Sequence, residues 1–181
     1  MRTLAHLMKR SRSRMAELTA LDEYVREDLG ADIVAWIAPG HRRHRWLPDG
    51  AGLSNCALKT ALAAALRDHL GPDWFIQIDA PYPDHRGQNK RDVADVVAWS
   101  PRGTPVVFEV QGASTYTSLS GDLDKISHHA TELKSSPVVR GYVVFPVYEP
   151  RRLTFWRDMR SEWQPAYPVP VPFLGAYAPT P

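Results

Sequence analysis

Two apolar, β-rich runs on either side of a short turn constrain the fold of this chain more than any other feature. Residues 92–99 read DVADVVAW and residues 105–111 read PVVFEVQ, and Arg102-Gly103 lies between them. Runs of this kind around a Pro- and Gly-containing turn predict an antiparallel β-hairpin. Side chains alternate between the faces of a strand, so Glu109 and Gln111 share one face of the second strand, opposite its apolar residues.

The predicted hairpin carries acids where a core strand is expected to be apolar. With the turn near Arg102-Gly103, Asp95 comes close to opposite Glu109, and facing residues on one face lie about 5 Å apart at Cβ. Two carboxylates that close are driven towards protonation unless a cation lies between them. Mg²⁺ takes a few carboxylate oxygens, with water and substrate phosphate completing its shell. The pair, with Gln111 beside it, predicts a metal site for phosphodiester cleavage; the alternative is a solvated hairpin face.

Periodicity around the hairpin predicts an α/β fold. The expected helices span residues 15–29 (ending at Gly30), 57–70 and 120–133. The expected strands outside the hairpin are 32–38, 74–78 and 138–145, with loops at 39–52 and 80–90. The central order of helix, three strands, helix and strand predicts a mixed sheet flanked by helices.

A chain of 181 residues is expected to form a single domain. Residues 1–52 are interpreted as an N-terminal helical and basic-loop extension, and residues 53–147 as the core. Residues 148–181, rich in proline and aromatic residues, are expected to form an irregular segment that packs Phe155, Trp156 and Trp163 against the body.

Several classes of protein are excluded by simple counts. The single cysteine, Cys56, cannot form an internal disulfide, a Cys-rich zinc module or an iron–sulfur cluster. The N-terminus lacks the pattern of a signal peptide, and no run approaches about eighteen apolar residues. We therefore expect a soluble, cytoplasmic protein without a membrane partner.

Basic residues are clustered, although the net charge is only +2. The clusters are Arg2, Lys9, Arg10, Arg12 and Arg14; Arg42, Arg43 and Arg45; and Arg86, Lys90 and Arg91. Such clustering suits a polyanionic partner such as nucleic acid, and the alternative for each cluster is a solvated face.

The string RDVADV at residues 91–96, followed by the hairpin and by FEVQ at 108–111 with Ser114 soon after, resembles the PD-(D/E)xK nuclease superfamily. Within it, the pattern is similar to that of the competence-protein CoiA-like nucleases. The resemblance covers about residues 53–146. It implies a restriction-endonuclease-like αβββαβ core and a nuclease that uses Mg²⁺ or Mn²⁺ to hydrolyse single- or double-stranded DNA.

The resemblance also implies roles for individual residues. Asp95 and Glu109 match the metal-ligating acids, and the backbone carbonyl of Val110 would add another oxygen. Gln111 stands where many members carry a lysine; its amide can orient a water molecule but supplies no positive charge. Lys59, on the preceding helix, matches a lysine of the family. It is a candidate to support a metal ligand from behind or to contact phosphate, or else it is an ordinary surface lysine.

The sequence also departs from the family pattern. Ala51 and Asn55 stand where the family helix brings an acid and a histidine, so a third metal ligand is missing. Asp79, at the end of the first strand, is the candidate replacement, or else a turn residue. The candidate contacts to the nucleic-acid backbone are Arg42, Arg43, Arg45, Arg91, Ser114, Lys125 and His128.

Three hypotheses follow. The first is a Mg²⁺-dependent nuclease acting on DNA. The second, motivated by the missing acid and histidine, is a nucleic-acid-binding module that keeps the fold without the chemistry. The third is an interaction subunit whose C-terminal segment contacts a protein partner.

Overall fold

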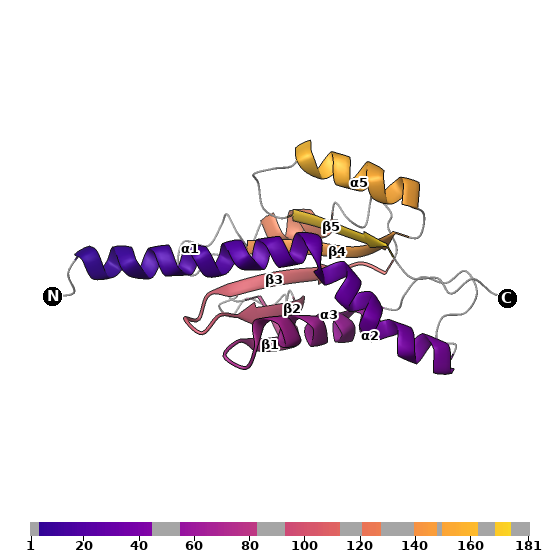
Figure 1. The fold of residues 1–181 in the computed structure, drawn as a ribbon, viewed down its shortest axis with the longest axis horizontal. Coiled ribbons are helices and arrows are strands. Elements are labelled where there is room, and N and C mark those ends of the chain that lie inside the picture. The colour runs from indigo at the N-terminus through magenta and orange to yellow at the C-terminus, as the bar shows by residue number, and fades with distance from the viewer. Residues whose placement is uncertain are drawn as a thin grey trace.

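The computed structural model describes residues 4–44, 55–82, 93–112, 121–127, 140–147, 150–162 and 169–174 (Figure 1). Its helices are α1 (Leu4–Glu27), α2 (Leu29–His44), α3 (Asn55–Leu70) and α5 (Pro150–Glu162), and residues 121–127 are also helical. Its strands are β1 (Phe75–Pro81), β2 (Val93–Trp99), β3 (Pro105–Val110), β4 (Arg140–Val147) and β5 (Val169–Leu174). None of the helices in these ranges is long and apolar enough to cross a bilayer.

The five strands form one mixed sheet in the order β1-β2-β3-β4-β5. Strand β2 runs antiparallel to both β1 and β3, and β4 runs parallel to both β3 and β5. The predicted hairpin is therefore confirmed as β2–β3, and its turn closes with the Gly103 amide donating to the Ser100 carbonyl at 2.8 Å. The predicted α/β class and the predicted order of helix, three strands, helix and strand are also found.

Each face of the sheet packs against its own set of helices. On one face, buried residues of α1, α2 and α3, such as Leu21 and Leu62, pack with Phe108 of β3. On the other face, Ile126 of the helical segment 121–127 and Trp156 of α5 pack with Val107 and other residues of β3 and β4. Figure 1 shows α1 running lengthwise in front of the sheet and α5 lying beside β5. The sheet is thus a central layer between two helical layers.

The alternation of side chains inverts part of the way along β1 and β2. Ile76 packs into the first core cluster and Ala80 into the second, although a spacing of four residues would keep both on one face. On β2, Val96 and Ala94 are divided between the clusters in the same way. Asp79 has a φ of 51°, in the left-handed region that few residues other than glycine adopt. Both strands therefore change face at the positions of their site acids.

The N-terminal prediction was wrong in three respects. The strand expected at 32–38 is part of α2, and Gly30 lies inside that helix instead of ending α1. The cause is the spacing of Leu29, Ile33 and Ile37, which places one apolar stripe on the core once the segment is helical. The helix also continues to His44, through the first part of the loop expected at 39–52.

The C-terminal segment is more regular than predicted, since it contains α5 and β5. Trp156 is buried as expected, but Phe155 is 56% exposed, and Trp163 lies outside the described residues. The prolines of β5, Pro170 and Pro172, suggested irregular structure. Proline is tolerated on an edge strand, where a missing amide leaves no partner strand unpaired.

Gly141 of β4 sets how closely the helical segment 121–127 approaches the sheet. A Cβ atom at Gly141 would lie 2.2 Å from Cγ2 of Ile126. The same segment carries Asp122 and Lys125.

We expect Gly141→Ala to lower the free energy of unfolding by about 1–3 kcal/mol, the usual cost of overpacking a core. Urea unfolding followed by circular dichroism measures it. Gly121→Ala is the control, because a Cβ there meets no atom within 4 Å. Equal unfolding midpoints for the two variants would contradict the packing argument.

Candidate active site

Three of the four acidic residues of the site occupy matching positions on adjacent strands. The β2–β3 register, continued one step beyond Val96 and Phe108, sets Asp95 opposite Glu109. The β1–β2 pairs on either side of Asp79 set that residue opposite Asp95. The backbone thus brings the acids together in register. Asp79 and Asp95 share Lys59 as a partner, whereas Glu109 contacts Lys125.

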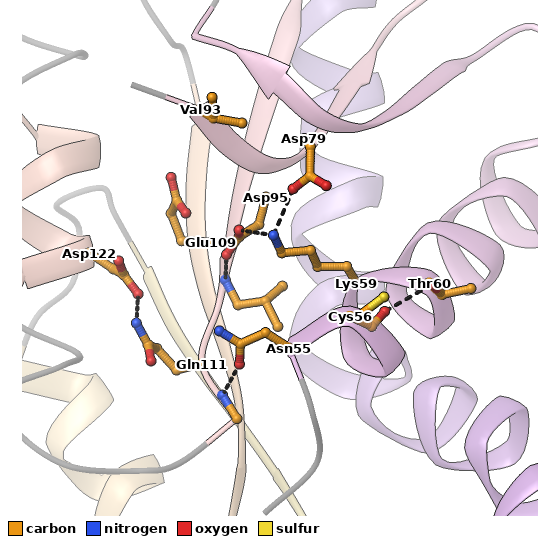
Figure 2. A network of polar contacts seen from close by, with 12 residues as sticks. Asn55, Cys56, Lys59, Thr60, Asp79, Val93, Asp95, Glu109, Gln111 and Asp122 are labelled. Atoms are coloured by element: carbon orange, nitrogen blue, oxygen red, sulfur yellow. Dashed lines mark hydrogen bonds and ion pairs between the residues drawn. The ribbon is translucent and has the colours of Figure 1, made fainter. Parts of the chain in front are cut away.

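Asp95 is joined to α3 through Lys59 (Figure 2). The Lys59 ammonium lies 2.7 Å from Oδ1 of Asp95 and 2.7 Å from Oδ1 of Asp79. Oδ2 of Asp95 accepts the backbone amide of Val110 at 2.8 Å. Burial alone would lower the pKa of Lys59, but the two carboxylates outweigh burial and raise it. Lys59 is therefore held as a cation between two acids, and both oxygens of Asp95 are engaged.

Glu109 is the most deeply buried acid of the site, with only 2% of the residue exposed. Its Oε1 accepts the Tyr82 hydroxyl and lies 2.9 Å from the Lys125 ammonium. Lys125 also donates to the Val93 carbonyl at 2.8 Å and lies 5.2 Å from the centre of the Tyr82 ring. Burial raises the pKa of Glu109 to about 7, although the contacts with Tyr82 and Lys125 oppose the rise. Glu109 therefore exchanges its proton near neutral pH.

Gln111 is oriented by the helical segment 121–127. Its side-chain Nε2 donates to Oδ2 of Asp122, and burial raises the pKa of Asp122. Next along the chain, the Gly112 amide donates to Oδ1 of Asn55 at 2.8 Å, which ties the end of β3 to the start of α3. The nitrogen of an amide donates hydrogen bonds and its oxygen accepts them. The contact with Asp122 uses Nε2 of Gln111, so Oε1 is the atom that can accept a hydrogen bond from another group.

The predicted site residues divide into two groups. Asp95, Lys59 and Asp79 form one network with the Val110 amide (Figure 2). Glu109 and Gln111 lie near it but make separate contacts, with Lys125 and Asp122 respectively. The candidate nucleic-acid contacts are described only in part: Arg42 and Arg43 belong to α2 without described side chains, and Arg45, Arg91, Ser114 and His128 lie outside the described residues. Lys125, expected to face the nucleic-acid backbone, contacts Glu109.

Sequence reasoning missed Tyr82 and Asp122. Tyr82 directly follows β1, in a stretch that was interpreted as a polar loop. Asp122 and Lys125 are three residues apart in a helical segment and therefore share a face, a spacing that is visible in the sequence. Tyr82 offered no comparable signal.

The donor chemistry fits a hard divalent cation. The available donors are carboxylate, amide and backbone oxygens, which Mg²⁺ and Mn²⁺ prefer. The site holds two more carboxylates than ammonium groups, counting Asp79, Asp95, Glu109 and Asp122 against Lys59 and Lys125. In the part of the chain that the structure describes, no three His, Cys, Asp or Glu side chains converge on one metal position. Mg²⁺ commonly uses only one or two carboxylates, with water and phosphate as its other ligands.

Comparisons of this chain with protein families, with curated proteins and with solved structures found no match. We therefore infer the function from the geometry of the site.

The pKa of Glu109 gives a prediction about stability. In the folded chain it lies at about 7, against 4.5 for an ordinary glutamate, so between these values the folded state binds more protons than the unfolded state. The free energy of unfolding therefore falls as pH rises through this window, and the loss is complete above it. Glu109→Gln keeps a neutral group in place and is expected to be more stable than the parent at pH 8, by about 1–3 kcal/mol.

Urea unfolding at several pH values between 4 and 8 measures this difference, which is expected to disappear towards pH 4. Glu23→Gln removes the same charge from an exposed position on α1 and controls for net charge. A stability difference between parent and Glu109→Gln that stays constant across this range would show that burial does not perturb Glu109.

Proposed function

We propose that this chain is a metal-dependent nuclease that hydrolyses phosphodiester bonds of DNA. The observation that carries the proposal is the row of acids on three adjacent strands, reached by one lysine from each helical layer. Burying charged groups in an apolar sheet costs free energy, so such a cluster is poorly explained by stability. A buried carboxylate such as Glu109, whose pKa is raised to about 7, is typical of a catalytic site.

The sequence resemblance supports the same reaction. Residues 91–96 and 108–111 resemble the PD-(D/E)xK nucleases of the CoiA-like type, and the residues matched to their acids are Asp95 and Glu109. The order α3, β1, β2, β3, helical segment 121–127 and β4 is also the order of that superfamily's core. A restriction-endonuclease-like arrangement is therefore part of the proposal.

In the proposed mechanism, Asp95, Glu109 and the backbone carbonyl of Val110 would hold Mg²⁺ or Mn²⁺. The bound ion would neutralise charge on the scissile phosphate and make a water molecule a stronger nucleophile. Gln111, held at its Nε2 by Asp122, presents Oε1 as an acceptor that orients the attacking water.

The positive charge that Gln111 cannot supply would come from Lys125, which lies beside Glu109. An ammonium group at this position stabilises negative charge as it develops on the phosphate oxygens. The basic clusters would contact the backbone of DNA in the cytoplasm and make binding sensitive to salt without reading sequence.

We expect Asp95→Asn and Glu109→Gln each to lower cleavage of single- and double-stranded DNA with Mg²⁺ or Mn²⁺ by about a hundredfold or more. Product formation on gels measures the rate, and circular dichroism confirms that the fold is retained. Asp124→Asn is the matched control, since Asp124 is an exposed acid on the segment that carries Asp122.

Cleavage by both site variants at the parent's rate would refute the proposal. A parent protein that retains DNA but does not cut it with either ion would favour the nucleic-acid-binding module. A parent that neither binds nor cuts DNA would favour the interaction subunit with a protein partner at its C-terminal segment.

A further inference from the structure

We infer that Lys59 is a resident cation that a divalent ion must displace from Asp95, and that Asp79 retains the displaced ammonium group. The inference rests on the proposed function, because that proposal makes Asp95 a metal ligand. It adds a positioning role for Lys59 and Asp79, distinct from phosphate contact and from metal ligation.

Both carboxylate oxygens of Asp95 already have a partner. Oδ2 accepts the Val110 amide at 2.8 Å, and this contact ties the side chain to the neighbouring strand β3. Oδ1 lies 2.7 Å from the Lys59 ammonium. A Mg²⁺ ion binds carboxylate oxygen at about 2.0–2.1 Å, so an ion on Oδ1 would lie within a few ångströms of a second cation. Displacing Lys59 breaks one ion pair, whereas releasing Oδ2 leaves a backbone amide without its acceptor.

Glu109 is arranged differently. The contacts that the described residues make to it all fall on Oε1, from Tyr82 and from Lys125. As far as the described residues go, Oε2 can therefore take an ion while Lys125 stays in place. The two lysines carry the same charge, but only Lys59 occupies the oxygen that a metal needs.

Asp79 is suited to hold Lys59 after it leaves Asp95. Its Oδ1 already lies 2.7 Å from the Lys59 ammonium, and its side chain is 62% exposed, against 18% for Asp95. An exposed carboxylate keeps most of its hydration, so it can hold the ammonium group without being buried itself. Asp79 also lies on β1, an outer strand of the described sheet, on the far side of Asp95 from Glu109.

The test measures binding of Mn²⁺ to the full chain without nucleic acid, by electron paramagnetic resonance of the free ion. We expect Lys59→Met to tighten binding by about tenfold, as for removal of a competing, partly buried ion pair. Lys125→Met is the matched control, which removes an equal charge from the same cluster; we expect it to tighten binding by less than about threefold, the size of a screened charge effect. Circular dichroism checks folding, and Lys59→Gln serves as a second variant if Lys59→Met unfolds.

Asp79→Asn separates retention of Lys59 from metal ligation. In the parent chain we expect Asp79→Asn to weaken Mn²⁺ binding, because displaced Lys59 loses its remaining partner. In the Lys59→Met chain we expect the same substitution to have no effect. Weakening of equal size in both backgrounds would mean that Asp79 ligates the ion and would overturn its assigned role.

Equal tightening in Lys59→Met and Lys125→Met, weaker binding in Lys59→Met, or no Mn²⁺ binding by any variant would also overturn the inference. The outcome is separable from that of the nuclease proposal. A chain that shows the expected binding pattern but cuts no DNA keeps the inference and loses the proposed function. If the parent chain cuts DNA with Mg²⁺ but Lys59→Met binds Mn²⁺ only as tightly as the parent, the proposed function stands and the inference about Lys59 is lost.

Discussion

A carboxylate buried in an apolar sheet needs a cation from outside the sheet, and this requirement links the two helical layers to the centre of the molecule. Glu109 is 2% exposed and is met by Lys125 of the helical segment 121–127 on one side. Asp95 is met by Lys59 of α3 on the other. Each layer thus supplies apolar side chains to its own core cluster and one ammonium group to the acids between them. The packing that stabilises the fold also fixes the charges of the site.

The hairpin and its acids could be predicted from sequence because their determinants are local. Two β-rich runs and a short turn set the register, and the register sets Asp95 opposite Glu109. The directions of the Asp79 and Asp95 carboxylates could not be predicted in this way. They depend on the inversion of strand faces where Asp79 adopts a left-handed backbone conformation, and strict alternation contains no sign of that inversion. Tyr82 reaches Glu109 for a related reason, since it follows β1 beyond the inversion.

The errors at the two ends of the chain arise from tertiary context. Residues 32–38 carry apolar side chains that satisfy both a strand pattern and a helical stripe, and the core against α1 and α3 selects the helix. The segment 169–174 alternates valine and proline before Phe173, and its position beside β4 makes it a strand. In both cases a short apolar pattern was compatible with two structures, and contacts distant in sequence decided between them.

The prolines of β5 have a consequence for self-association. Consecutive residues of a parallel strand direct their amides to opposite sides, and Pro170 and Pro172 share one side. Because proline has no amide hydrogen to donate to β4, the outward side is the one on which these two residues cost no ladder hydrogen bond. A chain approaching this margin would meet carbonyl acceptors but no donors at those two positions, so fibril-like stacking is disfavoured there. The prolines of β5 thus hinder the pairing of a further strand with this edge of the sheet.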